Sequence, residues 1–126
     1  MLPNLQSIFG DPIEQIVSAL NRGDACAVVA NYSANSKLVS DNQNIYKGTE
    51  QILKAMERRL KEDNGLQYRV VEADVLTIAS DVTVVELVVE KTPGYSLNRW
   101  ICVVKLVDGE WKIAAQWVIS NSVEAK

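Results

Sequence analysis

The sequence predicts an α+β domain in which three helices cover one face of an antiparallel sheet. Apolar residues recur at helical spacing through the first half of the chain, whereas long runs rich in Val, Ile and Thr fill the second half. Helices followed by a meander of strands are typical of this class. Because the chain has 126 residues and 48% of them are hydrophobic, we expect residues 1–126 to form a single domain with its core at about 11–120.

Two helices are expected in the first quarter of the chain. Asp11 is placed to cap the first helix, and Pro12 suits its first position. Gly23 is expected to end the helix in the left-handed backbone conformation that glycine adopts readily. Asp24 is placed to cap a second, short helix over residues 25–32.

A third helix is expected after a polar segment. Residues 33–48 predict two brief extended pieces around a turn at Asp41-Asn42, and Thr49 is placed to cap the helix that follows. The buried side of this helix is predicted to carry Ile52, Leu53, Met56 and Leu60. Its basic residues alternate with glutamates, which is typical of a solvated face: Lys54, Arg58, Arg59 and Lys61.

The second half of the chain predicts four strands. They are separated by Ser80-Asp81, Pro93-Gly94 and Asp108-Gly109. Short turns of this kind join antiparallel neighbours, because a parallel connection needs about a dozen residues or more.

The Asp-Gly pair at 108–109 is the strongest hairpin signal in the chain. With these two residues in the turn, Leu106 pairs with Trp111. The same register pairs Trp100 with Trp117 on an apolar face that should lie against the helices. Two indoles there either pack in the core or form the wall of a pocket. The sequence is compatible with both arrangements. The residues expected to line such a pocket are Tyr32, Asn98, Trp100, Cys102, Ala115 and Trp117.

The other face of this hairpin has an apolar centre and a charged rim, a pattern typical of a contact between subunits. We therefore expect a homodimer packed through the outer face of the sheet. Its interface is predicted to contain Ile101, Val103, Lys105, Val107, Lys112, Ala114 and Val118.

Three segments, in this order and spacing, resemble the nuclear transport factor 2-like superfamily, in particular its small bacterial SnoaL-like members: LNRGDACAVVANYSANSKLVS, YKGTEQILKAM and VDGEWKI. The resemblance extends from about Asp11 to Ser120. It implies a cystatin-like cone, in which three helices close the mouth of a strongly curved antiparallel sheet around a pocket, and frequent dimerisation through the sheet. The superfamily contains isomerases, cyclases, dehydratases and epoxide hydrolases as well as binding modules, so the fold does not give the function.

The resemblance also implies where a catalytic carboxylate would be found. The isomerases and cyclases carry one after the short extended segment that follows the second helix, and Ser40 stands at the matching position. Asp41 comes one residue later, which in a strand turns its side chain to the opposite face. From the residues alone, Asp74 is a second candidate, because the strand face that it shares with Leu76 carries the bulkier apolar side chains and is expected to face inward.

Composition excludes several kinds of chemistry. The chain has no histidine, so it has no Ser-His or Cys-His nucleophile pair and no histidine-ligated metal, and we expect neither a metal nor a cofactor. A net charge of −3 argues against a nucleic-acid partner, and no apolar run approaches the ~18 residues of a membrane span. No secretion signal is recognised, so Cys26 and Cys102 are expected to be reduced thiols in the cytoplasm. A disulfide between them is the alternative.

Three functions follow, in order of preference. The first is a dimeric module that binds a small apolar or aromatic ligand between Trp100 and Trp117. The second is an isomerase, cyclase or dehydratase that acts on an enolisable carbonyl compound through Asp41 or Asp74. The third is a structural dimer with a filled cone.

Overall fold

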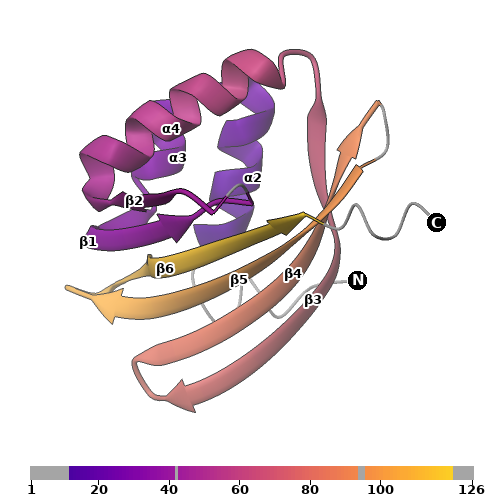
Figure 1. Cartoon of the computed structure of the whole chain (residues 1–126). Coiled ribbons are helices and arrows are strands. Elements are labelled where there is room, and N and C mark those ends of the chain that lie inside the picture. Colours follow the sequence, from indigo (N-terminus) through magenta and orange to yellow (C-terminus); the bar gives the residue numbers. More distant parts are fainter. Residues whose placement is uncertain (1–11, 42, 94–95, 121–126) are drawn as a thin grey trace.

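The computed structural model describes residues 12–41, 43–93 and 96–120. Within them, the helices α2 (Pro12–Arg22), α3 (Ala25–Val29) and α4 (Gly48–Glu62) lie on one side of a curved sheet (Figure 1). The strands are β1 (Tyr32–Val39), β2 (Ile45–Lys47), β3 (Gln67–Ala79), β4 (Val82–Thr92), β5 (Ser96–Val107) and β6 (Glu110–Ser120). The α+β class predicted from the sequence is confirmed. None of the helices in the described part of the chain is long and apolar enough to cross a membrane.

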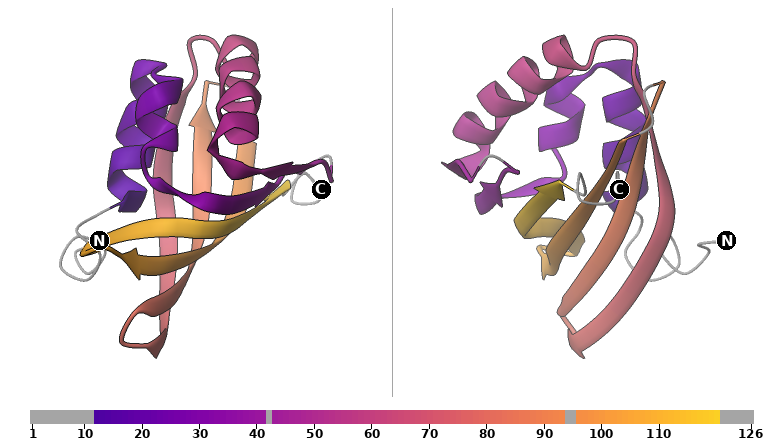
Figure 2. Two further views of the ribbon diagram at one scale, coloured as in Figure 1. Left: turned by 90° about the vertical axis from the view of Figure 1, so that its left-hand side faces the viewer. Right: turned by 45° about the vertical axis from the view of Figure 1, so that its right-hand side comes forward.

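The six strands are arranged in the order β2-β1-β6-β5-β4-β3. β1 pairs antiparallel with β2 but parallel with β6, so the sheet is mixed and the prediction of a purely antiparallel sheet is wrong. The parallel contact is possible because α4 and four strands lie between β1 and β6 in the chain, far more than a parallel connection needs. Figure 2 shows the sheet curving around the helices, with the far end of the β3–β4 hairpin extending beyond them.

The ends of α2 and α3 follow the predicted signals. Gly23 adopts a φ of 71° directly after α2, a conformation that favours glycine. The side chain of Asp24 accepts a hydrogen bond of 3.1 Å from the backbone N–H three residues later and thus caps α3. This helix ends at Val29, earlier than predicted, and Tyr32 begins β1 instead. The predicted cap at Asp11 lies outside the described residues.

Helix α4 begins at Gly48, before the predicted cap. Its N-cap residue is Lys47, whose backbone N–H donates to the Oε1 atom of Gln51 at 2.8 Å. Thr49 therefore lies inside the helix and does not cap it. Gln51 lies four residues after the cap, and its side chain satisfies that N–H in the way that a capping-box side chain does from three residues after it.

The core lies between the helices and the inner face of the sheet. Each fully buried Ile, Leu or Val side chain contributes roughly 1.5–3 kcal/mol through loss of contact with water. Alternate residues of β4 point into this core, as predicted. The largest fully buried side chains are Ile13, Ile16, Ile52, Leu87, Ile113, Val28, Val85, Val89, Val104, Thr83 and Cys102.

The β5–β6 hairpin turns where the sequence predicted. Asp108 and Gly109 both have positive φ, 51° and 81°, as a tight two-residue hairpin turn requires. Leu106 pairs with Trp111. After four pairs, however, the register shifts at a β-bulge that leaves Ala114 without a partner.

This bulge decides which side chains face the helices. Beyond it, Trp100 pairs with Val118 and Trp117 pairs with Ile101, so the predicted pairing of Trp100 with Trp117 is wrong. Trp100 is 6% exposed on the inner face, whereas Trp117 is 41% exposed on the outer face. Because side chains alternate along a strand, a shift of one residue moves every later side chain to the other face.

A bulge in β3 has the same effect on Asp74. The β3–β4 turn forms where predicted, but Thr77 pairs with Thr83 and leaves Ile78 unpaired. Asp74 consequently pairs with Glu86 on the outer face, where it is exposed. The prediction that favoured Asp74 on the inner face is wrong, because turn position alone does not reveal an unpaired residue.

Candidate functional site

A cavity of about 130 Å³ lies between α2, α4 and the inner face of the sheet. For scale, a cavity of about 150 Å³ in an engineered protein holds one benzene molecule. The enclosed space therefore suits roughly one six-membered ring. Its apolar wall includes Ile16, Leu20, Leu38, Met56, Trp100 and Val118.

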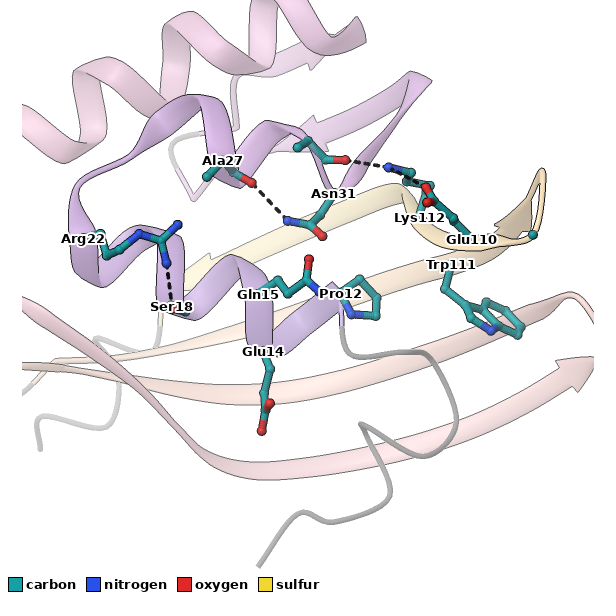
Figure 3. Close-up of a pocket in the computed structure, with 12 residues that line it drawn as sticks. Pro12, Glu14, Gln15, Ser18, Arg22, Ala27, Asn31, Glu110, Trp111 and Lys112 are labelled. Carbon is teal, nitrogen blue, oxygen red and sulfur yellow. Dashed lines mark hydrogen bonds and ion pairs between the residues drawn. The ribbon is translucent and has the colours of Figure 1, made fainter.

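A larger hollow of about 800 Å³ lies between α2, α3 and the β5–β6 turn (Figure 3). Several of its polar groups are already engaged with one another. Lys112 donates to the Ala30 carbonyl at 2.7 Å and lies 3.4 Å from Glu110. Asn31 donates to the Ala27 carbonyl at 3.1 Å. Since most of its lining is exposed, we take the inner cavity as the candidate site.

The buried end of the inner cavity, which we define as Tyr32, Trp100 and Gln116, contains a polar pair. The hydroxyl of Tyr32 donates to the Oε1 atom of Gln116, and both residues are buried. Burial raises the pKa of the Tyr32 phenol well above its ordinary value, and the nearby Cys102 adds to this effect. Tyr32 therefore stays protonated and acts as the donor in this pair.

A second polar cluster, Asp63, Tyr68 and Lys91, joins the end of α4 to strands β3 and β4. The Tyr68 hydroxyl donates to Asp63 Oδ2 at 2.5 Å, and Lys91 Nζ donates to the same oxygen at 3.3 Å. The side chains of Asp63 and Lys91 are each only 11% exposed. Burial, followed by the hydrogen bond to Asp63, raises the pKa of Tyr68. The other carboxylate oxygen, Oδ1, makes no hydrogen bond with any residue in the described part of the chain.

Arg58 and Arg59 also line the cavity, although the sequence predicted a solvated face for them. Arg59 pairs with Asp41 at 3.4 Å. Both side chains are partly exposed, so this ion pair contributes little to stability. Asp41 itself is not part of the cavity wall, whereas the preceding residue, Ser40, is. This arrangement agrees with the expectation that the two side chains point in opposite directions.

Half of the predicted pocket residues line the cavity: Tyr32, Asn98 and Trp100. Cys102 is fully buried beside them, and burial raises the pKa of its thiol to about 12, but it does not line the space. Ala115 and Trp117 lie beyond the bulge and face outward. The prediction is therefore wrong for these two residues, for the register reason given above.

Because of the same bulge, only some of the predicted interface residues lie on the outer face. Four of them lie on β5 and are half-buried or exposed at the outer face: Ile101, Val103, Lys105 and Val107. Val118 instead lines the cavity, so its prediction is wrong. Ala114 is the unpaired bulge residue, and Lys112 binds the Ala30 carbonyl. Trp117 occupies the outer position opposite Ile101, and Ile119 occupies the position opposite Arg99 that was predicted for Val118.

Sequence reasoning did not single out Asp63, Lys91 or Gln116. The position of Lys91 was predictable, because it continues the inward-facing alternation of Val85 through Val89 on β4. Asp63 resembled an ordinary residue at a helix end. Its partners, Tyr68 and Lys91, come from the strands β3 and β4. Gln116 was placed on the outer face by the regular register.

Across residues 12–41, 43–93 and 96–120, no three His, Cys, Asp or Glu side chains are grouped closely enough to hold a metal ion.

A curved mixed sheet, with helices on one face and a cavity between them, is the arrangement of the cystatin-like fold. An uncharacterised protein with a cystatin-like fold from Caulobacter vibrioides has a TM-score of 0.82 at 16% identity, over 96% of this chain and 89% of that one. An NTF2-like protein of unknown function from Pseudomonas putida KT2440 has a TM-score of 0.81 at 16% identity, over 94% and 88%.

The same fold is found in the hexachlorocyclohexane dehydrochlorinase LinA-type3 from Novosphingobium barchaimii LL02, with a TM-score of 0.81 at 10% identity, over 94% of this chain and 88% of that one. Neither a protein-family model nor a curated protein matches the sequence. The chain thus has the cystatin-like fold of NTF2-like proteins.

Proposed function

We propose that this protein is a dimeric, SnoaL-like module that binds a small molecule in the cavity beside Trp100. The composition of the cavity carries the proposal. Apolar and aromatic side chains from α2, β1, α4, β5 and β6 surround the buried part of the space, where Tyr32 and Gln116 are the polar groups, and charged side chains such as Arg58, Asp63 and Lys91 line the rest. An apolar lining with a small number of oriented polar groups is typical of ligand sites. The volume limits the enclosed part of the ligand to roughly one ring.

Tryptophan fluorescence tests this proposal, because Trp100 is the one tryptophan in the cavity wall. The chain has three tryptophans, so the double variant W111F/W117F leaves Trp100 as the sole reporter. Titration with single-ring ketones, alcohols and hydrocarbons should give a saturable change in its emission. The variant Trp100→Phe, which keeps the two other indoles, should show no saturable change. A flat response of the Trp100 reporter to every compound would contradict the proposal.

The dimer is the second part of the proposal, and the outer face of β5 and β6 supports it. Trp117 pairs there with Ile101, and Ile119 pairs with Arg99. An ion pair of 2.5 Å between Arg99 and Glu86 borders these apolar groups. Exposed aromatic and aliphatic side chains beside charged residues are typical of the centre and rim of an interface. The bulge adds an indole to this surface, and a second copy of the chain would cover it.

Light scattering tests the dimer. The wild-type protein should have twice the mass of the chain, and Trp117→Lys should shift it to the monomer. Ile45→Lys on β2 is the matched control, because Ile45 is also exposed but lies away from the outer face of β5 and β6. A monomeric wild-type protein at every concentration would contradict this part of the proposal.

A second candidate function, an enzyme acting on an enolisable carbonyl compound, is favoured by the geometry of Asp63. Two donors hold one carboxylate oxygen and leave Oδ1 without a partner in the described part of the chain. A carboxylate oriented in this way can accept a proton from a carbon next to a carbonyl group, leaving the electron pair in an enolate. Neither Asp41 nor Asp74 offers this arrangement.

Exchange in heavy water distinguishes the enzyme from the binding module. A base at Asp63 should replace the hydrogens next to the carbonyl of cyclohexanone with deuterium faster than the solvent alone. Asp63→Asn should abolish the difference, while Asp74→Asn, an exposed carboxylate outside the cavity, should keep it. Equal exchange with and without the protein would leave only the binding function.

A further inference from the structure

We infer that the buried end of the cavity is a subsite for a neutral acceptor oxygen, such as a ketone or amide carbonyl on a ring, with the side-chain amide of Gln116 as its donor. This inference rests on the proposed function, since it requires a ligand in the cavity. It adds the chemical class of that ligand and the direction in which it enters.

The hydrogen bonding of Gln116 is the first observation. Its Oε1 atom accepts from Tyr32, which fixes the orientation of the amide and leaves the Nε2 hydrogens for another acceptor. No residue in the described part of the chain accepts from Nε2. Among these residues only Ser36 Oγ is both unpartnered and shielded from solvent, so Nε2 is unpartnered but accessible. Since Gln116 is 2% exposed and lines the cavity, the cavity is the space that Nε2 can reach.

Trp100 supplies a second donor in the same wall. Its indole N–H also has no hydrogen-bond partner among the described residues, and the side chain is almost completely buried. Trp100 pairs with Val118 and Gln116 pairs with Cys102, so Trp100 and Gln116 are diagonal neighbours on the inner face of adjacent strands. Diagonal neighbours lie within reach of long side chains. A carbonyl oxygen has two lone pairs and can accept from both donors.

The charges around the cavity favour a neutral group at this end. Three cations line the cavity, and none of them belongs to its buried end: Lys91 is paired with Asp63, Arg59 is paired with Asp41, and Arg58 is exposed. The buried end contains only a phenol, an indole and a carboxamide. Burying a carboxylate there without a cation would cost more free energy than burying a carbonyl group, which the two donors would satisfy.

A pair of ligands of nearly equal shape tests the inference. Cyclohexanone and methylenecyclohexane differ only in whether the ring carries C=O or C=CH2. By calorimetry, the wild-type protein should bind cyclohexanone about fivefold more tightly, the usual effect of one hydrogen bond. Preferred binding of cyclohexanecarboxylate over cyclohexanone would overturn the neutral subsite and assign recognition to the basic residues. If none of the three compounds binds, the proposed function fails together with this inference. If the ring compounds bind without preference for the ketone, only this inference fails.

Two variants locate the donor. Tyr32→Phe keeps the amide of Gln116 and should keep the preference for the ketone. The double variant Y32F/Q116M removes both members of the polar pair, so neither is left unpaired, and it should lose the preference. Retention of the preference in the double variant would overturn the assignment. An independent readout in the wild-type protein is the NMR signal of the Gln116 side-chain amide. It should move with cyclohexanone more than with methylenecyclohexane, and equal shifts would contradict the inference.

Discussion

Trp100 and Trp117 lie on opposite faces of the sheet, although uninterrupted pairing of β5 with β6 would place them directly across from each other. The single unpaired residue Ala114 shifts the register by one, and this shift turns Trp117 to the outer face. Trp100 is thereby left in the wall of the cavity, while Trp117 is added to the outer face. The bulge thus places one indole in the proposed binding site and the other on the surface proposed for the dimer.

We expect the two indoles to differ in their accessibility to a quencher. Proteins with Trp100 alone (W111F/W117F) and Trp117 alone (W100F/W111F) should be compared in acrylamide quenching, at a concentration where the protein is monomeric. The Stern–Volmer slope should be several-fold steeper for Trp117, because its exposed fraction is 41% against 6%. Equal slopes would show that the bulge is absent.

The two cysteines should differ in reactivity toward a disulfide reagent such as DTNB. Cys26 is exposed and should react in the native protein. Cys102 is fully buried with a raised pKa, so it carries little thiolate and should react only after unfolding. We expect one thiol per chain to react in buffer and two in denaturant, and Cys26→Ser should reduce the native value to zero.

Stability should decline in alkaline solution through Cys102. Its pKa rises from an ordinary 9.0 to about 12 in the folded protein. Above about pH 9 the unfolded thiol ionises while the folded thiol keeps its proton, so the free energy of unfolding falls with pH between these two values. The slope from this one group approaches about 1.4 kcal/mol per pH unit. Urea unfolding from pH 8 to 10.5 should show a shallower slope for Cys102→Ala than for the wild type, whatever its absolute stability.

The buried ion pair between Asp63 and Lys91 should be strongly coupled. A double-mutant cycle with Asp63→Asn and Lys91→Met should give a coupling energy of about 1–3 kcal/mol, because each side chain is only 11% exposed. Arg22 and Asp24 form the control pair, since they lie 4.0 Å apart with side chains 57% and 48% exposed. Their coupling should stay below about 0.5 kcal/mol. Similar values for both pairs would contradict the burial of the cluster.

Removal of the Ser36 hydroxyl should stabilise the protein. Ser36 is fully buried and its Oγ atom has no hydrogen-bond partner, so the native state carries the cost of desolvating this group. Ser36→Ala should raise the free energy of unfolding by about 1 kcal/mol in urea denaturation. The exposed Ser18→Ala, which loses only a surface hydrogen bond to Arg22, is the control and should change stability by less than about 0.5 kcal/mol. A destabilised Ser36→Ala protein would indicate a partner for the hydroxyl.

Local signals in the sequence were sufficient for the presence of the three helices, the hairpin turns at 80–81 and 108–109, and the fold class, whereas the predicted turns at Asp41-Asn42 and Pro93-Gly94 include residues outside the described ones. Gly23 and Asp24 act within a few residues of themselves, and the Asp-Gly turn at 108–109 needs only two residues that accept positive φ. The inner face of β4 was predicted from the bulkier apolar side chains on it, such as Val85 and Leu87, because both faces of the strand are half apolar and periodicity alone does not distinguish them. These features depend on backbone conformation and local hydrophobic periodicity, both of which can be read along the chain.

Only the tertiary structure decided which residues form the site. The faces of Trp117, Gln116 and Asp74 depend on bulges, and a bulge arises from how two strands curve together around the helices rather than from the pattern of either strand. The parallel contact of β1 with β6 and the meeting of Asp63 with Lys91 join segments far apart in the chain. Periodicity shows which side chains of a strand share a face. The pairing of one strand with the next determines the direction in which they point.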